Sequence, residues 1–385
     1  MRINFLCTAH LSLVALALLT NFIPLQADQV DEFLQGEMTR QKIPGMSIAV
    51  VRNGQAVKVN GYGSANLELN VPATPQTVYQ MASMTKQFTA AAIVLLAKDG
   101  RLQLEDKIAA YLPGIPEHWG SITIRHLLSM TAGIKDYNQS LGDSHEEFDE
   151  AALVRAITAL PLDFPAGTKW AYSNSNYILL AMIVKRLSGN SYDEFLAERV
   201  FKPFGMNSTK RDKPADVVTN RAALYELKID QIVNARFINP TLFNNGDGGL
   251  LTTVLDLARW DAALAPGKLF NTRTLERIWT PASSKGNVLK HYGFGWYLNQ
   301  AGRHRIVLHG GGRPGTSTQI SRFLDAGITV AVLINRSGVN AEKIAHEVAA
   351  NYIPDLPAYP AGPIRNPPRW GANDRLIPIN ADTEK

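Results

Sequence analysis

The stretch Ser83-Met84-Thr85-Lys86 is followed directly by an apolar run that extends to about Lys98. The apolar residues at helical spacing in that run are Phe88, Ala91, Val94 and Leu95. With Gly100 as a stop signal, the pattern predicts a helix over about 83–98. Residues three apart share one helical face, so we expect the Ser83 hydroxyl and the Lys86 amine to lie side by side.

A primary amine beside a serine hydroxyl is a candidate catalytic pair. Partial burial lowers the pKa of an amine, which can then take the hydroxyl proton as the serine attacks a carbonyl carbon. The helix N-terminus also favours the negative charge that develops on the substrate. The pattern therefore indicates a hydrolase that forms an acyl-serine intermediate. Taken alone, Ser83 and Lys86 also fit an N-cap serine followed by a surface lysine.

Two further motifs accompany this pair. Tyr172-Ser173-Asn174 lies inside Phe164-Pro-Ala-Gly-Thr-Lys-Trp-Ala-Tyr-Ser-Asn-Ser-Asn-Tyr177, and His309-Gly310-Gly311 follows the β-rich run 305–308. In order, spacing and flanking sequence, the three motifs resemble the serine β-lactamase and penicillin-binding protein superfamily. The resemblance is strongest to its class C-like branch, with D-Ala-D-Ala carboxypeptidases, esterases and D-amino-acid peptidases. The segments that extend it over nearly the whole chain are 45–51, 127–133, 248–253, 256–260 and 292–296.

The resemblance implies a role for each motif. Ser83 would be the nucleophile, and Lys86, Tyr172 or both would supply the base. Asn174 would hydrogen-bond Lys86 or the substrate. The substrate would lie against His309, Gly310, Gly311 and Gly312. The backbone amides of Ser83 and Gly312 would form the oxyanion hole. The alternative for Tyr172 is an ordinary half-buried tyrosine, since Tyr297-Leu298-Asn299 repeats the bare Tyr-x-Asn pattern.

His309 bears on the choice of substrate. It stands where many members of the superfamily carry the lysine of a Lys-Thr-Gly motif. Histidine has an ordinary pKa of about 6.5 and is largely neutral at pH 7, so it attracts a substrate carboxylate less than lysine does. Penicillins and terminal D-Ala peptides carry that carboxylate, for which Arg313 or Arg336 could supply a charge. We therefore expect an esterase or a D-amino-acid peptidase or carboxypeptidase before an efficient β-lactamase.

The non-enzymatic alternative is an inactive penicillin-recognising fold used for binding or scaffolding in the cell envelope. Such a protein is expected to lose at least one member of the catalytic set, whereas Ser83, Lys86 and Tyr172 are all retained. No Gly-x-Ser-x-Gly, His-Glu-x-x-His or Cys-x-x-Cys motif of another hydrolase class is present. We expect no metal or other cofactor. The stretch 143–150, with His145 among acidic residues, fits a solvated acidic loop better than a metal site.

The chain has 385 residues, of which 45% are hydrophobic and 19% charged, as in globular proteins with a large core. It opens with Arg2, an apolar stretch over 11–19 and Pro24-Leu-Gln-Ala27, which predicts a secretory signal cleaved near Ala27. The alternative, an uncleaved anchor, is disfavoured because the run is shorter than the roughly 18 residues of a spanning helix. A secreted or periplasmic protein without stable membrane insertion is therefore expected.

The cysteine count and the net charge limit the expected cross-links and partners. The single cysteine, Cys7, lies in the predicted signal, so the mature chain would form no disulfide. The formal net charge of +5 becomes +4 when Arg2 is removed, and no Lys/Arg-rich run is present. Nucleic acid is therefore not an expected partner, whereas a small ester, amide or D-peptide substrate is. The sequence does not predict the oligomeric state.

The remaining patterns predict an α/β (α+β) fold of the β-lactamase/transpeptidase type. The β-rich runs are 46–51, 55–61, 305–308, 316–323 and 328–334, and Asn53-Gly54 predicts a hairpin between the first two. Helical patterns cover 151–160, 177–188, 192–200, 254–264 and 341–352. We expect an antiparallel sheet flanked by helices, with a mostly helical inserted region.

Three segments are predicted along the chain. Residues 1–27 would be the signal peptide, and 28–353 the hydrolase domain. The sheet part of that domain would span about 28–82 and 290–353, and the helical region about 83–289. The Pro-rich tail 354–385 is expected to be loop or extended chain.

Overall fold

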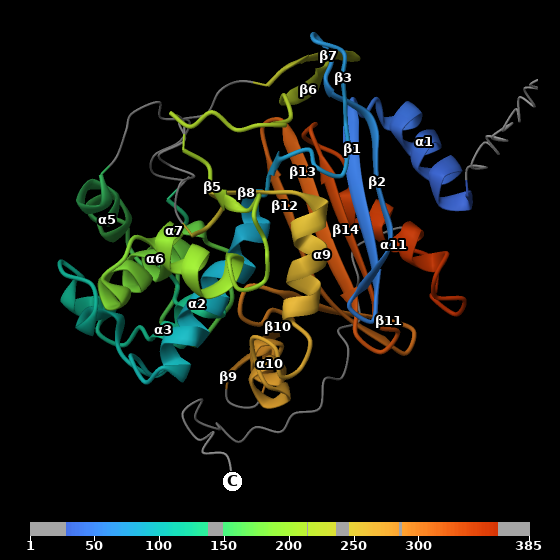
Figure 1. Cartoon of the computed structure of the whole chain (residues 1–385). Helices are drawn as coiled ribbons and strands as arrows, with labels where there is room; N and C mark the ends of the chain where they lie inside the picture. The colour runs from blue at the N-terminus through green and yellow to red at the C-terminus, as the bar shows by residue number, and fades with distance from the viewer. Residues whose placement is uncertain (1–27, 138–148, 214, 236–245, 285–286, 361–385) are drawn as a thin grey trace, which may run out of the picture.

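The computed structural model describes residues 28–137, 149–213, 215–235, 246–284 and 287–360 (Figure 1). The predicted signal, most of the acidic stretch 143–150 and the tail beyond residue 360 lie outside these described residues. Within the described part of the chain, no helix has the length and apolar character needed to cross a bilayer.

Seven antiparallel strands form the central sheet in the order β11-β12-β13-β14-β1-β2-β3. The strands are β1 Gly45–Arg52, β2 Gln55–Asn66, β3 Val71–Pro72, β11 Tyr297–Ala301, β12 His304–Arg313, β13 Thr316–Phe323 and β14 Ile328–Ile334. The N-terminal and C-terminal parts of the sheet meet where β1 pairs with β14, from Met46 opposite Ile334 to Arg52 opposite Ile328. The predicted hairpin turn is present, with positive φ of 50° at Asn53 and 79° at Gly54, as a type I′ turn requires.

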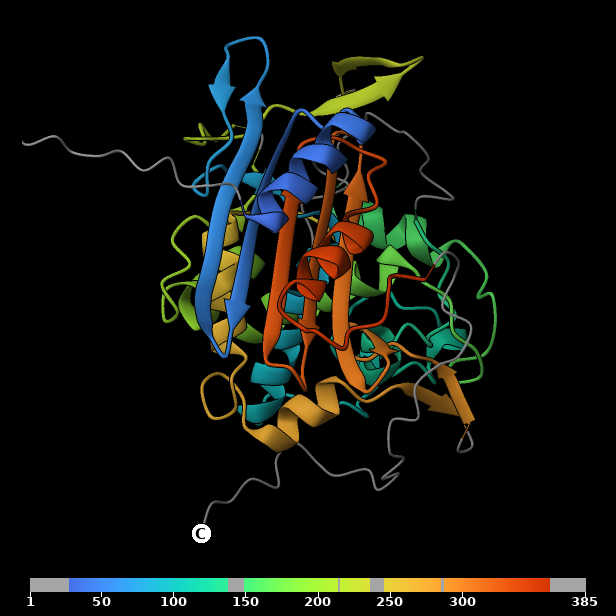
Figure 2. The ribbon, with the colours of Figure 1, turned by 90° about the vertical axis from the view of Figure 1, so that its right-hand side faces the viewer.

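Helices cover both faces of this sheet (Figures 1 and 2). Helices α1 Gln29–Gln41 and α11 Ala341–Ala350 lie on one face, and α9 Val254–Ala263 lies on the other with the helical region. Alternate residues of a strand point to opposite faces, so Val332 packs with the α1 and α11 side and Leu333 with the helical side. The sequence analysis missed α1, whose signal is the reciprocal cap between Asp28 and Asp31.

The region between β3 and β11 is mostly helical, as predicted. Its helices among the described residues are η1 Ala82–Thr85, α2 Lys86–Lys98, η2 Ile108–Ala110, η3 Glu117–Trp119, α3 Ile124–Leu128, α5 Glu150–Thr158, α6 Asn174–Ser188, α7 Tyr192–Leu196, η4 Ala197–Phe201, α9 and α10 Thr272–Ile278. The sequence analysis did not predict its short strands, which are β4 Tyr79–Gln80, β5 Lys210–Arg211, β6 Tyr225–Lys228, β7 Gln231–Asn234, β8 Leu250–Thr252, β9 Ala282–Ser284 and β10 Asn287–Lys290. The predicted fold class, an antiparallel sheet flanked by helices, is confirmed.

Two differences from the sequence-based prediction concern the site. The predicted helix over 83–98 begins as the 3₁₀ turn η1 and becomes α-helical only at Lys86. Strand β12 continues to Arg313, although the pattern predicted β structure only to residue 308. Glycine has a low preference for strands, but Gly310, Gly311 and Gly312 all pair with residues of β13.

Candidate active site

Ser83 lies in η1, between the end of β4 and the start of α2, and is half-buried. Two residues before Ser83, the backbone of Met81 is held by hydrogen bonds through both its N–H and its carbonyl. Its N–H donates to the Leu250 carbonyl at 2.8 Å, and Thr318 Oγ1 donates to its carbonyl at 2.9 Å. Ala82 then takes a left-handed conformation with φ 48°, which is uncommon outside glycine and occurs preferentially at functional sites. This local fold brings Ser83 beside strand β12.

Lys86 is fully buried beside Ser83. Its Nζ lies 3.2 Å from Ser83 Oγ, 2.8 Å from Asn174 Oδ1 and 2.7 Å from the Asp247 carbonyl oxygen. Burial lowers the pKa of Lys86 to about 8, while the charges of Asp247 and Asp136 act in the opposite direction.

The partners of Lys86 suit both of its charge states. An ammonium has three N–H groups for the three acceptors. A neutral amine has two N–H groups, which the Asn174 and Asp247 carbonyl oxygens can accept. Its lone pair then faces Ser83 Oγ, where it can receive the hydroxyl proton.

Asn174 is oriented by a carboxylate that the sequence analysis did not single out. Asp136 Oδ2 accepts from the backbone N–H and from Nδ2 of Asn174, both at 2.8 Å. A carboxylate only accepts, so the amide nitrogen faces Asp136 and the amide oxygen faces Lys86. The first residue of α6 therefore presents its oxygen to the amine.

Asp247 is a second carboxylate in the site, and it is buried. Its Oδ2 accepts from the Tyr137 hydroxyl at 2.9 Å, while its own backbone carbonyl accepts from Lys86. Burial raises the pKa of Asp247, and the nearby Lys86 charge opposes that rise. The sequence analysis missed Asp247 and Tyr137, although Asp247 directly precedes the segment 248–253 that it used.

Tyr172 lies just before α6, with its ring centroid 4.9 Å from Lys86 Nζ. Burial raises the pKa of Tyr172 above its ordinary value, and a hydrogen bond with the Ser83 side chain partly offsets that rise. The phenol is therefore neutral near pH 7. Lys86 and Tyr172 meet at the same serine hydroxyl, as the motifs led us to expect.

His309 is buried inside β12. Its Nδ1 lies 2.6 Å from the Gly310 carbonyl oxygen, which only accepts, so Nδ1 carries the hydrogen. Nε2 is then free to accept from the Tyr292 hydroxyl, at 3.3 Å. Burial, and secondarily the Lys86 charge, lower the pKa of His309 to about 3. His309 is thus neutral at physiological pH, as its ordinary pKa already suggested.

Tyr297 joins the site from the edge strand β11. Its ring lies parallel to that of Tyr172, with the centroids 6.5 Å apart, and 5.2 Å from the His309 ring. From sequence, the Tyr-x-Asn that begins at Tyr297 showed only that the bare pattern occurs twice, and Tyr297 was not predicted as a site residue. Sequence spacing could not show that β11 carries this residue to Tyr172.

The glycines of β12 differ in their surroundings. A Cβ on Gly311 would lie 2.3 Å from the Met81 carbonyl oxygen, so glycine lets β12 lie against the segment that carries Ser83. A Cβ on Gly310 would lie 2.8 Å from Gln319 Oε1, whereas one on Gly312 would meet nothing within 4 Å. Gly312 therefore borders open space next to the site.

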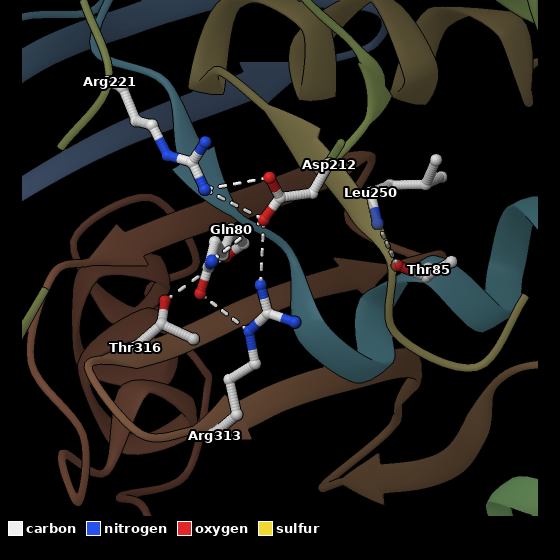
Figure 3. Close-up of polar contacts among 7 residues, drawn as sticks. All are labelled: Gln80, Thr85, Asp212, Arg221, Leu250, Arg313 and Thr316. Carbon is white, nitrogen blue, oxygen red and sulfur yellow. Dashed lines mark hydrogen bonds and ion pairs between the residues drawn. The ribbon is translucent and has the colours of Figure 1, made fainter. Parts of the chain in front are cut away.

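The two arginines considered as carboxylate partners are placed differently. Arg313 forms an ion pair with Asp212 at 3.2 Å and donates to Gln80 Oε1 at 2.7 Å (Figure 3). Arg336 is buried two residues after the end of β14, where its backbone forms an isolated parallel β-bridge with Tyr225. The described residues contain no group of His, Cys, Asp and Glu side chains arranged to hold a metal ion.

Comparisons with known proteins identify the family of the chain. A family model described as Beta-lactamase matches residues 30–352. Penicillin-binding protein 4* of Bacillus subtilis is 31% identical over 337 residues, covering 82% of this chain and 74% of that protein.

Solved structures give the same result. An octameric penicillin-binding protein homologue from Pyrococcus abyssi has a TM-score of 0.72 and 26% identity, covering 86% of this chain and 78% of that one. The D-amino acid amidase of Ochrobactrum anthropi SV3 shares the fold with a TM-score of 0.73 and 22% identity, covering 84% of this chain and 99% of that one. The chain therefore belongs to the β-lactamase family and is a serine hydrolase of the β-lactamase and penicillin-binding protein superfamily.

Proposed function

We propose that the protein is an exported hydrolase that cleaves an ester or amide through an acyl-Ser83 intermediate. The observation that carries this proposal is the position of Lys86 Nζ, 3.2 Å from Ser83 Oγ, with two carbonyl oxygens to hold its N–H groups. Acyl transfer needs a base at that position.

In acylation, neutral Lys86 takes the Ser83 proton while Ser83 Oγ bonds to the substrate carbonyl carbon. The carbonyl π electrons move to its oxygen, which the amides of Ser83 and Gly312 stabilise. When the bond to the leaving group breaks, Tyr172 gives its phenol proton to that group and recovers a proton from Lys86. A raised pKa suits Tyr172 to this acid role, because the phenol keeps its proton at neutral pH. The products are the acyl-enzyme and the protonated leaving group.

Deacylation follows the same route with water as the nucleophile. Lys86 and Tyr172 together take a proton from the water as its oxygen attacks the ester carbonyl. The bond to Ser83 Oγ then breaks, and the same pair returns the proton to the serine. The enzyme regains its starting state, and the acid product leaves.

The charges near Ser83 favour some substrates over others. A neutral His309 offers no positive charge to a substrate carboxylate, and Arg313 is engaged with Asp212. Asp136 and Asp247 add negative charge around Lys86. We therefore place simple esters and D-amino-acid amides or peptides first. The amidase from Ochrobactrum anthropi is named for D-amino acids, which supports the second class.

Intact-protein mass spectrometry tests the proposal. Residues 28–385, as wild type and as Ser83→Ala, are exposed briefly to an activated butyrate ester, benzylpenicillin or a D-Ala-D-Ala peptide. The wild type should gain the acyl mass from the ester or the peptide, and the variant should gain none. The full chain made in a secreting host should show the mass of a protein cleaved near Ala27.

The outcomes separate the candidate functions. An adduct with benzylpenicillin that is rapidly hydrolysed would identify a β-lactamase instead. Turnover that persists in Ser83→Ala would remove Ser83 as the nucleophile. If the wild type forms neither an adduct nor a product with any of the three, the binding or scaffolding alternative replaces the hydrolase.

A further inference from the structure

A largely buried polar cluster joins the ends of β4 and β12 (Figure 3). We call it the Asp212 cluster; it consists of Gln80, Asp212, Arg221 and Arg313. Asp212 Oδ2 accepts from Gln80 Nε2 at 2.9 Å and from Arg313 at 3.2 Å, while Arg313 Nε donates to Gln80 Oε1 at 2.7 Å. These three side chains thus form a closed triangle. Arg221 adds bonds of 2.8 and 3.0 Å to the two oxygens of Asp212.

The triangle joins the two segments that would supply the oxyanion hole. Gln80 ends β4, three residues before Ser83, and Arg313 directly follows Gly312 at the end of β12. Thr316, across the turn from Arg313, also donates to the Gln80 carbonyl, at 3.2 Å. The spacing of the Ser83 and Gly312 amides therefore depends on how Gln80 and Arg313 are held.

Asp212 is a third, independently anchored point. Its N–H donates to the Gly249 carbonyl at 2.9 Å, which attaches it to the segment leading into β8. Its side chain is only 5% exposed and that of Arg313 only 11%. The pair is shielded from solvent, so its geometry is held more firmly than that of a surface ion pair.

We infer that Asp212 is a positioning residue that sets the distance between the Ser83 and Gly312 amides; this rests on the function proposed above. Asp212 touches neither amide and acts through Gln80 and Arg313. An oxyanion hole works only when both donors meet the developing charge, and a misplacement of about 1 Å can cost about 100-fold in rate.

The chain offers a matched control for a purely structural role. Asp261 and Arg322 form another buried ion pair at 2.7 Å, with side chains 6% and 10% exposed. Arg322 lies near the other end of β13 from Thr316, about 20 Å along the strand. Asp261→Asn should therefore weaken the fold without altering the spacing of the two amides.

The test compares Asp212→Asn and Asp261→Asn in residues 28–385. Melting temperature, the rate constant for acylation by p-nitrophenyl butyrate, its KM and the affinity for phenylboronic acid are measured. Boron bonds to Ser83 Oγ while Lys86 takes the serine proton, which gives a tetrahedral boronate anion that reports on the oxyanion hole. We expect Asp212→Asn to slow acylation about 10- to 100-fold and to weaken boronate binding similarly, with a smaller change in KM. Asp261→Asn should lower the melting temperature and leave both other quantities near wild type.

Gln80→Met provides a second variant that removes the link without leaving a charge unpaired. It should reproduce the loss of acylation and boronate binding even if Asp212→Asn fails to fold. The inference is overturned if folded Asp212→Asn or Gln80→Met acylates and binds boronate as wild type does. Failure of the proposed function looks different, since the wild type would then show no Ser83-dependent acylation or boronate binding, and the inference would fall with it.

Discussion

Burial of single residues determines the chemistry of the site. Lys86 is surrounded by protein, so its charged form loses the stabilisation that water would give. Two carboxylates, Asp136 and Asp247, moderate this effect. The balance leaves the pKa of Lys86 at about 8, where a modest rise in pH produces the neutral amine.

The first prediction concerns pH. Acylation that needs neutral Lys86 should become faster as pH rises through about 8 and then level off. Asp247 favours the ammonium, so Asp247→Asn should lower the pKa of Lys86 and move the rising limb down by roughly one pH unit. The measurement is kcat/KM for a butyrate ester from about pH 6 to about pH 10, a range that brackets the pKa of Lys86.

The control for this prediction is Asp325→Asn, because the Asp325 carboxylate pairs with Arg305 between the start of β12 and the turn that joins β13 to β14. In this variant, kcat/KM should rise over the same pH range as in wild type. A rate that falls as pH rises through the Lys86 pKa would instead make the ammonium the active form. Tyr172 would then be the better candidate for the base.

Some of the site could be predicted from sequence and some could not. Ser83 and Lys86 are three residues apart, so local helical geometry alone brings them together. Asp247 is 161 residues from Lys86 and reaches it only through tertiary packing. No short pattern marks such a residue, and Tyr297 was missed for the same reason.

Strand β12 is the secondary-structure element on which the site depends. The patterns of Thr316–Phe323 and Ile328–Ile334 predicted β13 and β14 to the residue, because both are continuous apolar or β-preferring runs. The same reasoning ended β12 five residues early, at its glycines. One of them, Gly311, allows the close approach to Met81, and a propensity scale does not register that need.

The second prediction contrasts two of these glycines. Gly311→Ala should destabilise the protein by about 1 to 3 kcal/mol, because its methyl group would overlap the Met81 carbonyl and force β12 away from η1. Gly312→Ala places its methyl group in open space and should change stability by no more than about 0.5 kcal/mol. Urea unfolding of both variants measures the difference. Equal stabilities would show that β12 and η1 are not in firm contact.

In the whole molecule, β1–β3 and β11–β14 form one sheet, and the part of the chain between β3 and β11 forms the helical region. Residues 304–334 and 45–66 are far apart in sequence, yet β14 pairs with β1 along its entire length. The site lies where this sheet meets the helical region. His309 comes from the sheet, and Ser83 and Tyr172 come from the helical region. The β-rich runs predicted the longer strands, but no pairing order was predicted from the sequence, because β1 and β14 meet only through tertiary packing.

The last prediction concerns residues 354–360, the described part of the predicted tail. The sequence placed the domain boundary at residue 353, but the next residues are attached to the sheet and α11. Asp355 pairs with Arg303 at 2.8 Å and His304 at 3.1 Å, and the His346 ring donates to the Pro357 carbonyl at 2.8 Å. Removing 354–360 would leave the buried His304 and His346 without these partners, at a cost on the order of 1 to 3 kcal/mol.

Protein ending at residue 353 should therefore melt at a lower temperature than protein ending at residue 360. Acylation of Ser83 in the still-folded protein should be unchanged. Leu356 packs in the cluster with α11, whereas Met81 and Met84, on either side of Ser83, belong to the cluster on the other face of the sheet. Calorimetry of both proteins and a burst assay with the butyrate ester measure the two effects. Identical melting temperatures would place the boundary at 353, whereas a slower burst would mean that the segment supports the site through the sheet.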